Sequence, residues 1–446
     1  MKKISIDFEN SVGRIKAMHA VGQPPFLGMN FSFFSYLKAA NIPYSRLHDV
    51  GGAYGRGVFV DIPNLFRNFE ADENDPASYD FAFTDALLSA LMEHGVKPFF
   101  RLGVTIENYR NIKAYRIYPP KDFAKWARVC EHIIRHYNEG WADGFAFGID
   151  YWEIWNEPDS GPGEVSEMWF GTPEQYFDLY KITAAHLKKC FGDKIKVGGY
   201  AACGLYAMRN GALEAEDKES LSYHEKRTLH WHKFFHMFMD MLKKDRPPMD
   251  FFSYHSYDTV ENTIFYQRYI EEKLEEVGYG DVEIHNNEWN THHEIETVGT
   301  AAAAAHTAAM MCALQKTKLH MLMYYDARIG ASLYGGMFDP RFRRPFCTYD
   351  AFLSFGKLYA LGTEVKIDGL SDGLYATAAT NGRERAILLS NIGETKEISL
   401  NLQGKYYAYS VTDDRRMKPE KIDPSAFVME KETFILLSTE EIEIPK

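Results

Sequence analysis

Two glutamates in this chain each follow a short apolar run and lie beside a tryptophan. Glu157 belongs to YWEIWNEPD, in which the apolar run ends at Trp155 and Pro158 cannot continue a strand. Glu288 belongs to VEIHNNEWNT, next to Trp289. Cleavage of a glycosidic bond requires two carboxyl groups, one to protonate the leaving oxygen and one to attack the anomeric carbon or to activate water. The two motifs therefore indicate a site for sugar chemistry.

Most of the 62 acidic residues are expected to be solvated surface groups, and this is the plain alternative for either glutamate. The pair Asn156 and Glu157 is different, because an amide and an acid between Trp and Pro have little packing role. The amide can also hydrogen-bond the sugar hydroxyl next to the anomeric centre. The competitors of Glu288 do not end an apolar run beside an aromatic residue; they are Glu283, Glu294 and Glu296.

Short β-rich runs alternate with helical periodicity over the first 326 residues, which is the pattern of parallel strands joined by crossover helices. The expected strands are Ile15–Val21, Pro43–Leu47, Lys97–Leu102, Tyr151–Trp155, Lys194–Gly198, Asp250–Tyr254, Val282–Asn286 and Leu319–Tyr324. Helical segments between them include Tyr79–His94, Asp122–Tyr137, Pro173–Cys190 and Thr300–Gln315. Eight such units predict an α/β fold, the (β/α)8 TIM barrel.

The barrel explains how the two carboxylates can meet. Active sites of this fold lie at the carboxyl ends of the strands, where the fourth run delivers Glu157 and the seventh delivers Glu288. Three strands apart on a closed ring, the two side chains can face each other across the mouth. The eighth strand is expected to end near Tyr325, which places that side chain at the same mouth.

The texture of the sequence changes after about Leu361, where short alternating strands are separated by Gly, Asn and Asp turns. We therefore expect a barrel over residues 12–361 and a smaller C-terminal antiparallel β-sandwich over residues 362–446. The opening strand, Lys3–Phe8 within residues 1–11, also alternates and is expected to pair with this sandwich. The alanine run Ala301–Ala305 indicates a tightly packed barrel helix.

Several segments together resemble glycoside hydrolase family 39, the β-xylosidase and α-L-iduronidase family of the retaining (β/α)8-barrel glycosidase clan A. The likeness covers residues 40–360 and rests on YSRLHDV, DPASYDF, FTDALLSALMEHGVKPFFRLG, YWEIWNEPD, DFFSYHSYD and NNEWNT. The resemblance implies a retaining mechanism with Glu157 as general acid/base and Glu288 as nucleophile. Retention in turn predicts carboxyl groups about 5–5.5 Å apart.

The same resemblance suggests His48, His255 and Tyr257 as sugar-binding or nucleophile-orienting residues, although a histidine at such a place can also be a satisfied core residue. A tyrosine at a strand end can donate a hydrogen bond to the nucleophile and hold it ionised. The full set expected to contact substrate is His48, Asn156, His255, Tyr257, Trp289 and Tyr325.

The eighth strand reads MLMYYDARIG where family members usually show Trp followed by acidic residues. This departure leaves the identity of the sugar open, and Asp326 and Arg328 could form a loop salt bridge or contact the sugar. The resemblance favours an exo-acting β-xylosidase that removes the terminal sugar of short oligosaccharides. An arabinosidase, a uronidase, a transglycosylase and a non-catalytic carbohydrate-binding protein are the alternatives. An acidic sugar would require a basic partner, and the candidates are Arg46, Arg101 and Arg328.

The charge of the chain limits the classes of molecule that it is expected to bind. A formal net charge of −12 and a pI near 5.8 argue against a nucleic acid or an anionic membrane, so a small neutral carbohydrate is the expected partner. The chain has no apolar run long enough to span a membrane, and MKKISIDFEN lacks the apolar run of a signal peptide, which favours the cytoplasm. A homo-oligomer is left open.

No cofactor or metal is expected to take part in the reaction. The five cysteines are scattered without a CxxC spacing, so neither a disulfide framework nor a zinc site is indicated. The histidine-rich segments His292–Glu294 and Leu229–Phe238 are more typical of packing than of metal binding. The glycine-rich segment Gly51–Gly57 lacks the Lys-Ser/Thr ending of a phosphate-binding loop and is expected to lie over the site.

Overall fold

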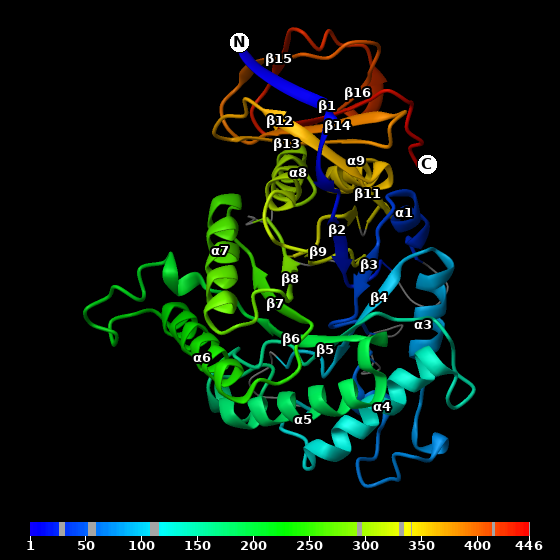
Figure 1. The fold of residues 1–446 in the computed structure, drawn as a ribbon, viewed down its shortest axis with the longest axis vertical. Coiled ribbons are helices and arrows are strands. Elements are labelled where there is room, and N and C mark those ends of the chain that lie inside the picture. Colours follow the sequence, from blue (N-terminus) through cyan, green and yellow to red (C-terminus); the bar gives the residue numbers. More distant parts are fainter. Residues whose placement is uncertain are drawn as a thin grey trace.

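The computed structural model describes residues 1–25, 32–51, 59–107, 116–291, 297–329, 334–339, 341–412 and 415–445. Eight parallel strands close into a barrel in chain order (Figure 1). They are β2 (Ala17–Gly22), β3 (Tyr44–Arg46), β4 (Lys97–Leu102), β5 (Tyr151–Ile154), β6 (Lys196–Ala202), β7 (Phe251–Ser256), β8 (Glu283–Trp289) and β9 (Met321–Tyr324). The predicted TIM barrel is confirmed.

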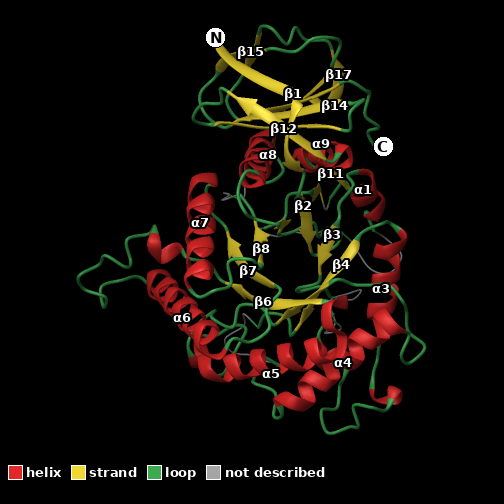
Figure 2. Ribbon diagram, in the orientation of Figure 1, coloured by secondary structure: helices red, strands yellow, loops and turns green. Residues whose placement is uncertain are grey.

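Helices surround this barrel, as Figure 2 shows. The start of one of these helices is clearly encoded: Thr172 and Gln175 form a capping box around Pro173, the first residue of α5. The described α-helices are α1 (Phe34–Ala39), α2 (Ile62–Leu65), α3 (Ala82–Glu93), α4 (Phe123–Glu139), α5 (Pro173–Phe191), α6 (Tyr223–Asp245), α7 (Val260–Glu276), α8 (Ala301–Gln315) and α9 (Cys347–Leu361). Short 3-10 turns are η2 (Pro76–Ser78), η3 (Gly163–Val165), η4 (Gly192–Lys194) and η5 (Tyr206–Met208).

Most barrel strands differ from their predicted bounds by one to four residues, and two of these differences bear on the site. β8 continues past Asn286 to Trp289, because it stays paired with β7 through Glu288 and Trp289. β6 begins at Lys196, since the turn η4 intervenes after α5. Glu288 is therefore held within a strand of the barrel, whereas Glu157 lies in the connection that follows β5.

A second sheet of nine strands lies beyond the barrel, in the order β17-β16-β19-β14-β13-β12-β1-β15-β18. Its strands are β1 (Lys2–Arg14), β12 (Thr363–Asp368), β13 (Leu374–Thr380), β14 (Arg385–Asn391), β15 (Lys396–Leu400), β16 (Tyr407–Thr412), β17 (Arg415–Glu420), β18 (Phe427–Met429) and β19 (Thr433–Ser438). A separate pair, β10 (Phe338–Asp339) and β11 (Arg344–Pro345), precedes α9. The C-terminal β region predicted from the sequence is confirmed.

The N-terminal strand β1 belongs to this second sheet. It pairs antiparallel with β12 and, near its start, parallel with β15, which makes the sheet mixed. Register shifts after Asp7 and after Ser11 interrupt its pairing with β12. The side chains of Ile4 and Ile6 are buried in the core of the sheet. Both chain termini consequently lie at this end of the molecule (Figure 1).

α8 and α9 lie between the barrel and the second sheet (Figure 1). The alanines of α8 explain how the helix fits there, because side chains as small as those of Ala304 and Ala308 are fully buried and permit close approach. The hydroxyl of Ser390 in β14 donates a hydrogen bond of 2.6 Å to the carbonyl oxygen of Ala305. One hydrophobic core runs from the barrel through these helices to Leu388 in the sheet. The division into domains at residue 361 stays a prediction.

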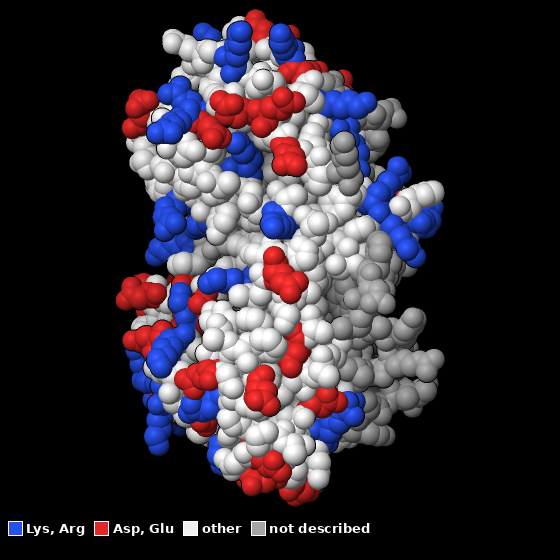
Figure 3. Space-filling model, turned by 90° about the vertical axis from the view of Figure 1, so that its right-hand side faces the viewer, with Lys and Arg blue, Asp and Glu red and all other residues white. Residues whose placement is uncertain are grey.

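The surface is of mixed charge. Acidic and basic side chains are interspersed over the face that Figure 3 shows. Acidic side chains lie among the basic ones on this face, whereas binding of a phosphate backbone requires clustered Lys and Arg. Among the described residues, no helix has the length and apolarity needed to cross a membrane.

Candidate active site

Glu157 and Glu288 are both delivered to the carboxyl end of the barrel strands. The backbone turns sharply after β5, where Trp155 and Glu157 have φ values of 73° and 44° in the left-handed region. The amide of Glu157 donates to the carbonyl oxygen of Ala201 in β6 at 3.1 Å, which ties the turn to the neighbouring strand. Glu288 needs no such turn, because it belongs to β8 itself. This is the strand-end placement expected for catalytic residues of a barrel.

The two carboxylates lie on either side of His255, at the end of β7. The Nδ1 atom of His255 is 2.7 Å from Oε1 of Glu157 and 3.6 Å from Oε2 of Glu288. One oxygen of each glutamate lies within 4.8 Å of the other. Retaining enzymes hold the two carboxyl groups about 5–5.5 Å apart, and enzymes that place a water between them hold them about 6.5–9.5 Å apart, so an oxygen pair this close favours the shorter spacing. The geometry suits direct attack by one carboxylate.

Glu288 is surrounded by groups that stabilise its charged form. Arg46 donates from Nη1 to Oε1 at 2.7 Å, and the Tyr257 hydroxyl donates to Oε2 at 2.8 Å. His48 lies next to the same carboxylate, with Nε2 at 3.9 Å from Oε1. Burial and the charge of Glu157 hold the pKa of Glu288 above its ordinary value, whereas Arg46 and the Tyr257 hydrogen bond lower it. These groups offset part of the cost of burying an ionised nucleophile.

Arg46 is fully buried and also contacts Glu153 and Asn156. Its Nη2 atom is 2.6 Å from Oε2 of Glu153 and donates to Oδ1 of Asn156 at 2.6 Å. A buried guanidinium requires such partners, because an unpaired charge in the core is strongly destabilising. From the sequence, Arg46 was expected only as a possible partner for an acidic sugar. The alternation of side chains along a strand could have indicated that Arg46 belongs to the site, because residues 46 and 48 point to the same face of β3 and its continuation.

Glu157 is also mostly buried, but its side chain contacts His255 and not Arg46 or Tyr257. Burial is the largest cause that raises its pKa, to about 7, and the charge of Glu167 adds to the rise. Arg227 and Arg46 lower the pKa by less. A carboxyl group with this pKa is partly protonated at neutral pH, which is the state a general acid needs. The two carboxyl groups of the site therefore have different partners, as acid/base and nucleophile roles require.

Asp159 is a buried acid beside this site that was not expected from the sequence. Burial, followed by the charge of Glu157, raises the pKa of Asp159 to about 8. The amide of Cys203 donates to both of its carboxylate oxygens, at 3.1 and 3.2 Å. The motif WNEPD contains the residue, but nothing in the sequence indicates that the residue directly after β6 would supply its partner.

Four of the six residues expected to bind substrate surround the carboxylates: His48, Asn156, His255 and Tyr257. Because Arg46 holds Oδ1 of Asn156, the Nδ2 atom of this buried amide is left without a partner among the described residues. The same holds for Nδ1 of His48 and Nε2 of His255. Burial lowers the pKa of His255 to about 4, so its ring is neutral at pH 7. Unpaired buried polar atoms at a strand-end site are suited to bind hydroxyl groups of a ligand.

Tyr325 also lies at this end of the barrel, directly after β9. Its hydroxyl accepts a hydrogen bond from Nε2 of Gln23 at 2.6 Å and lies 3.3 Å from Oδ2 of Asp49. Its ring is 6.4 Å from that of Tyr257 and 5.8 Å from that of Tyr334. Asp49 and Gln23 were not expected from the sequence, because a strand end carrying one polar residue does not reveal its partner on another strand.

Trp289 does not line the site, which corrects the prediction that it contacts substrate. Its side chain is fully buried and packs edge-on against Tyr324 in the hydrophobic core, with ring centroids 5.3 Å apart. The reason is strand alternation: the neighbour of Glu288 on β8 must point to the other side of the barrel wall.

The three arginines considered for an acidic sugar each have an acidic partner. Arg46 pairs with Glu153 and Glu288, and Arg328 pairs with Asp326 at 2.9 Å, the predicted loop salt bridge. Arg101 pairs with Asp61 at 2.8 Å. Its Nε and Nη1 atoms have no partner among the described residues.

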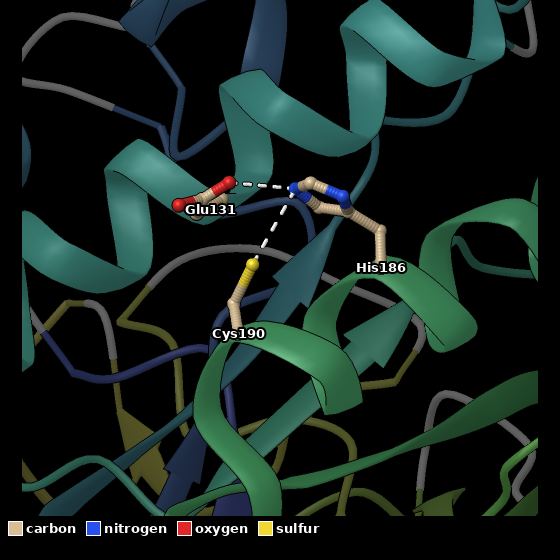
Figure 4. Close-up of side chains that lie close together, drawn as sticks. All are labelled: Glu131, His186 and Cys190. Atoms are coloured by element: carbon tan, nitrogen blue, oxygen red, sulfur yellow. Dashed lines mark hydrogen bonds and ion pairs between the residues drawn. The ribbon is translucent and has the colours of Figure 1, made fainter.

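Two groups of described side chains have the composition and spacing of metal ligands. One is Glu157, His255 and Glu288 itself, where the Arg46 guanidinium already supplies a positive charge to the nucleophile. The other is Glu131, His186 and Cys190 on the helices outside the barrel (Figure 4). The histidine-rich segment His292–Glu294 lies outside the described residues. So do residues 52–58, which include all of the glycine-rich segment except Gly51.

Comparisons with known proteins agree with this architecture. A β-xylosidase from Caldicellulosiruptor saccharolyticus is 28% identical over 207 residues, which is 45% of this chain and only 34% of that protein. A glucosidase from Croceicoccus marinus superimposes with a TM-score of 0.76 at 20% identity, over 98% of both chains. A family 39 β-xylosidase from Caulobacter crescentus gives 0.68 at 17% identity, over 99% of this chain and 100% of the other. The model of glycosyl hydrolases family 39 matches residues 29–312, more than half of the chain, and the chain belongs to that family.

Proposed function

We propose that this protein is a retaining exo-glycosidase that removes the terminal sugar of short oligosaccharides, with β-xylosidase as its activity. The observation that carries the proposal is the pair of carboxylates, one after β5 and one on β8, with one oxygen of Glu157 and one of Glu288 within 4.8 Å of each other. The family membership and the similarity to a β-xylosidase support the same reaction.

In the first step, an ionised Glu288 attacks the anomeric carbon while the bond from that carbon to the leaving oxygen breaks. The protonated carboxyl of Glu157 gives its proton to the leaving oxygen, which departs as an alcohol. The raised pKa of Glu157, about 7, supports this role. The product of the step is a glycosyl ester of Glu288.

In the second step, the Glu157 carboxylate removes a proton from water, and the water oxygen attacks the anomeric carbon. The ester bond breaks, Glu288 leaves as a carboxylate, and the sugar is released with its original anomeric configuration. Arg46 and Tyr257 stabilise the carboxylate that reappears, through the hydrogen bonds of 2.7 and 2.8 Å that they donate to it. His255 touches Glu157 and is placed to keep that side chain pointing at the reacting bond.

The site also bears on the choice of sugar. Asn156 presents an unpaired amide nitrogen beside the nucleophile's arginine, where it is suited to hold the hydroxyl next to the anomeric centre. A neutral sugar fits the pairing of Arg46 and Arg328 with acids. Arg101 is the remaining candidate for a uronic acid, because two of its nitrogens lack partners among the described residues.

A panel of p-nitrophenyl glycosides tests the proposal, with xylose, arabinose, glucose and glucuronic acid as the sugars and NMR to follow the anomer first released. We expect the β-xyloside to be the best substrate and the first product to be β-xylose. Preference for the uronide would identify a uronidase and point to Arg101, and formation of longer glycosides without hydrolysis would identify a transglycosylase. Binding without turnover of any glycoside, or release of the inverted anomer, would contradict the proposal.

A further inference from the structure

A second chemically capable cluster lies on the outer surface of the barrel, away from the strand ends. It is formed by Glu131 on α4 and by His186 and Cys190 on the neighbouring helix α5 (Figure 4). Nε2 of His186 is 2.6 Å from Oε2 of Glu131 and 3.7 Å from Sγ of Cys190. The three side chains thus converge on one point, with oxygen, nitrogen and sulfur donors.

The spacing of the two α5 residues explains half of this convergence. His186 and Cys190 are four positions apart, so they project from the same face of the helix. α4 packs beside α5 and brings Glu131 over this face. A CxxC search does not detect such a site, because its ligands come from two helices and only one of them is a cysteine.

The distances fit a tetrahedral divalent cation. Bonds of about 2.0 Å to nitrogen and oxygen and about 2.3 Å to sulfur place the three donor atoms roughly 3.3–3.6 Å apart. The observed nitrogen-to-sulfur distance is 3.7 Å, and all three donor atoms lie within 4.8 Å of one another. The glutamate oxygen at 2.6 Å needs to retreat from His186 by less than about 1 Å, which a side-chain rotation provides.

Arg135 supports the cluster. It donates from Nε to Oε1 of Glu131 at 2.8 Å, while Oε2 is the oxygen that faces His186. Arg135 is held in turn by Glu139 and by the face of the Phe191 ring, whose centroid is 5.2 Å from its guanidinium carbon. An arginine on the outer oxygen fixes the orientation of a carboxylate ligand, as the outer partners of metal ligands do.

The cluster is also accessible. The side chains of His186 and Glu131 are 27% and 14% exposed, so a hydrated ion can reach them. Cys190 is half-buried, whereas the other four cysteines of the chain are buried.

We propose that Glu131, His186 and Cys190 bind a zinc-class divalent cation, with water as the fourth ligand, and that the ion links α4 to α5. The thiolate and imidazole favour zinc or a similar borderline metal over Mg²⁺ and Ca²⁺, which prefer oxygen ligands. The site takes no part in bond cleavage, since its residues belong to the helices outside the barrel.

A pair of histidines on another helix serves as a matched control. His232 and His236 on α6 are also four positions apart, with their Nε2 atoms 3.2 Å from each other. The hydroxyl of Tyr269 lies 3.0 Å from the same nitrogen of His236, and this pair has no thiol ligand.

Titration of the chelator-treated protein with Co²⁺ tests the proposal, because a cobalt–thiolate bond produces a charge-transfer absorption band that imidazole and carboxylate ligands do not. We expect one equivalent of Co²⁺ to bind with this band and to be displaced by Zn²⁺. Cys190→Ser should abolish the band, and His186→Ala should weaken binding at least 10–100-fold. His232→Ala should change neither.

Thermal unfolding followed by circular dichroism gives a second readout and shows that each variant is folded. Zn²⁺ should raise the melting temperature of the unmodified protein and of His232→Ala, and should do so far less in Cys190→Ser, since a ligand that binds the folded state stabilises it. Absence of stoichiometric Co²⁺ binding would overturn the proposal. So would binding that lacks the thiolate band and disappears in His232→Ala.

Discussion

Replacement of Tyr257 by phenylalanine removes a single hydroxyl from the neighbourhood of Glu288. That hydroxyl donates a hydrogen bond of 2.8 Å to Oε2 of a carboxylate whose side chain is only 6% exposed, so water has little access to replace it. Arg46 still holds the other oxygen. The variant should therefore keep the fold and the salt bridge, while the charged form of Glu288 loses one of its stabilising partners.

The size of the effect follows from the hydrogen bond. A hydrogen bond to a charged group contributes about 1.5–3 kcal/mol, and each 1.4 kcal/mol corresponds to roughly one pKa unit. The Tyr257 hydrogen bond lowers the pKa of Glu288, so its loss should raise that pKa by about one to two units. Because the nucleophile must be ionised, the acidic limb of kcat/KM should move up in pH by the same amount. At pH values below the acidic limbs of both proteins, kcat/KM of the variant should be about 10–100-fold lower than that of the unmodified protein.

The assay is the pH dependence of kcat/KM with an aryl β-xyloside, and Tyr254→Phe is the matched control. Tyr254 lies on β7 and is also buried, but its hydroxyl donates to Gln267 at 3.0 Å and not to Glu288. The control should leave the acidic limb in place. A Tyr257→Phe variant whose activity falls equally at every pH, or whose profile matches that of the control, would show that Tyr257 does not stabilise the charged form of Glu288.

Three further outcomes are expected. The basic limb of kcat/KM should fall near pH 7, because Glu157 must be protonated and its pKa is raised to about 7, and Glu157→Gln should remove that limb. Arg46→Met should lower the free energy of unfolding by about 3–5 kcal/mol in urea denaturation, since it leaves Glu153 and Glu288 buried without their cation. Ala304→Leu should cost about 1–3 kcal/mol in the same assay, because α8 has no space for a larger side chain between barrel and sheet.

Local patterns in the sequence were sufficient to predict the barrel and the place of its two carboxylates. Alternation of apolar strands with periodic helices predicts the parallel barrel, and a barrel places Glu157 and Glu288 at one rim whatever the details of the loops. Tyr257 and the two histidines followed from the family resemblance and not from any local pattern. The alternation of Lys3–Phe8 likewise suggested a strand that pairs into the C-terminal sheet, and β1 pairs with β12 and β15.

Other features of the site could not be predicted from local patterns, because they depend on contacts between segments that are distant in the sequence. The partner of Glu288 is Arg46, 242 positions away, and a sequence does not state which buried acid meets which buried base. Trp289 was assigned to the site because it adjoins Glu288, although neighbours on a strand face opposite sides. The cluster on α4 and α5 was missed for a related reason, since Glu131 comes from a different helix than His186 and Cys190.

The central claim is that Glu288 forms a covalent bond to the sugar and that Glu157 does not. A 2-deoxy-2-fluoroxyloside with a good leaving group tests it most directly, because the fluorine slows both steps while the leaving group speeds the first, so that the ester accumulates. Mass spectrometry of the digested protein should then find one added sugar on the peptide that contains Glu288. An adduct on Glu157 or on another carboxylate, or hydrolysis with inversion and no adduct, would contradict the account.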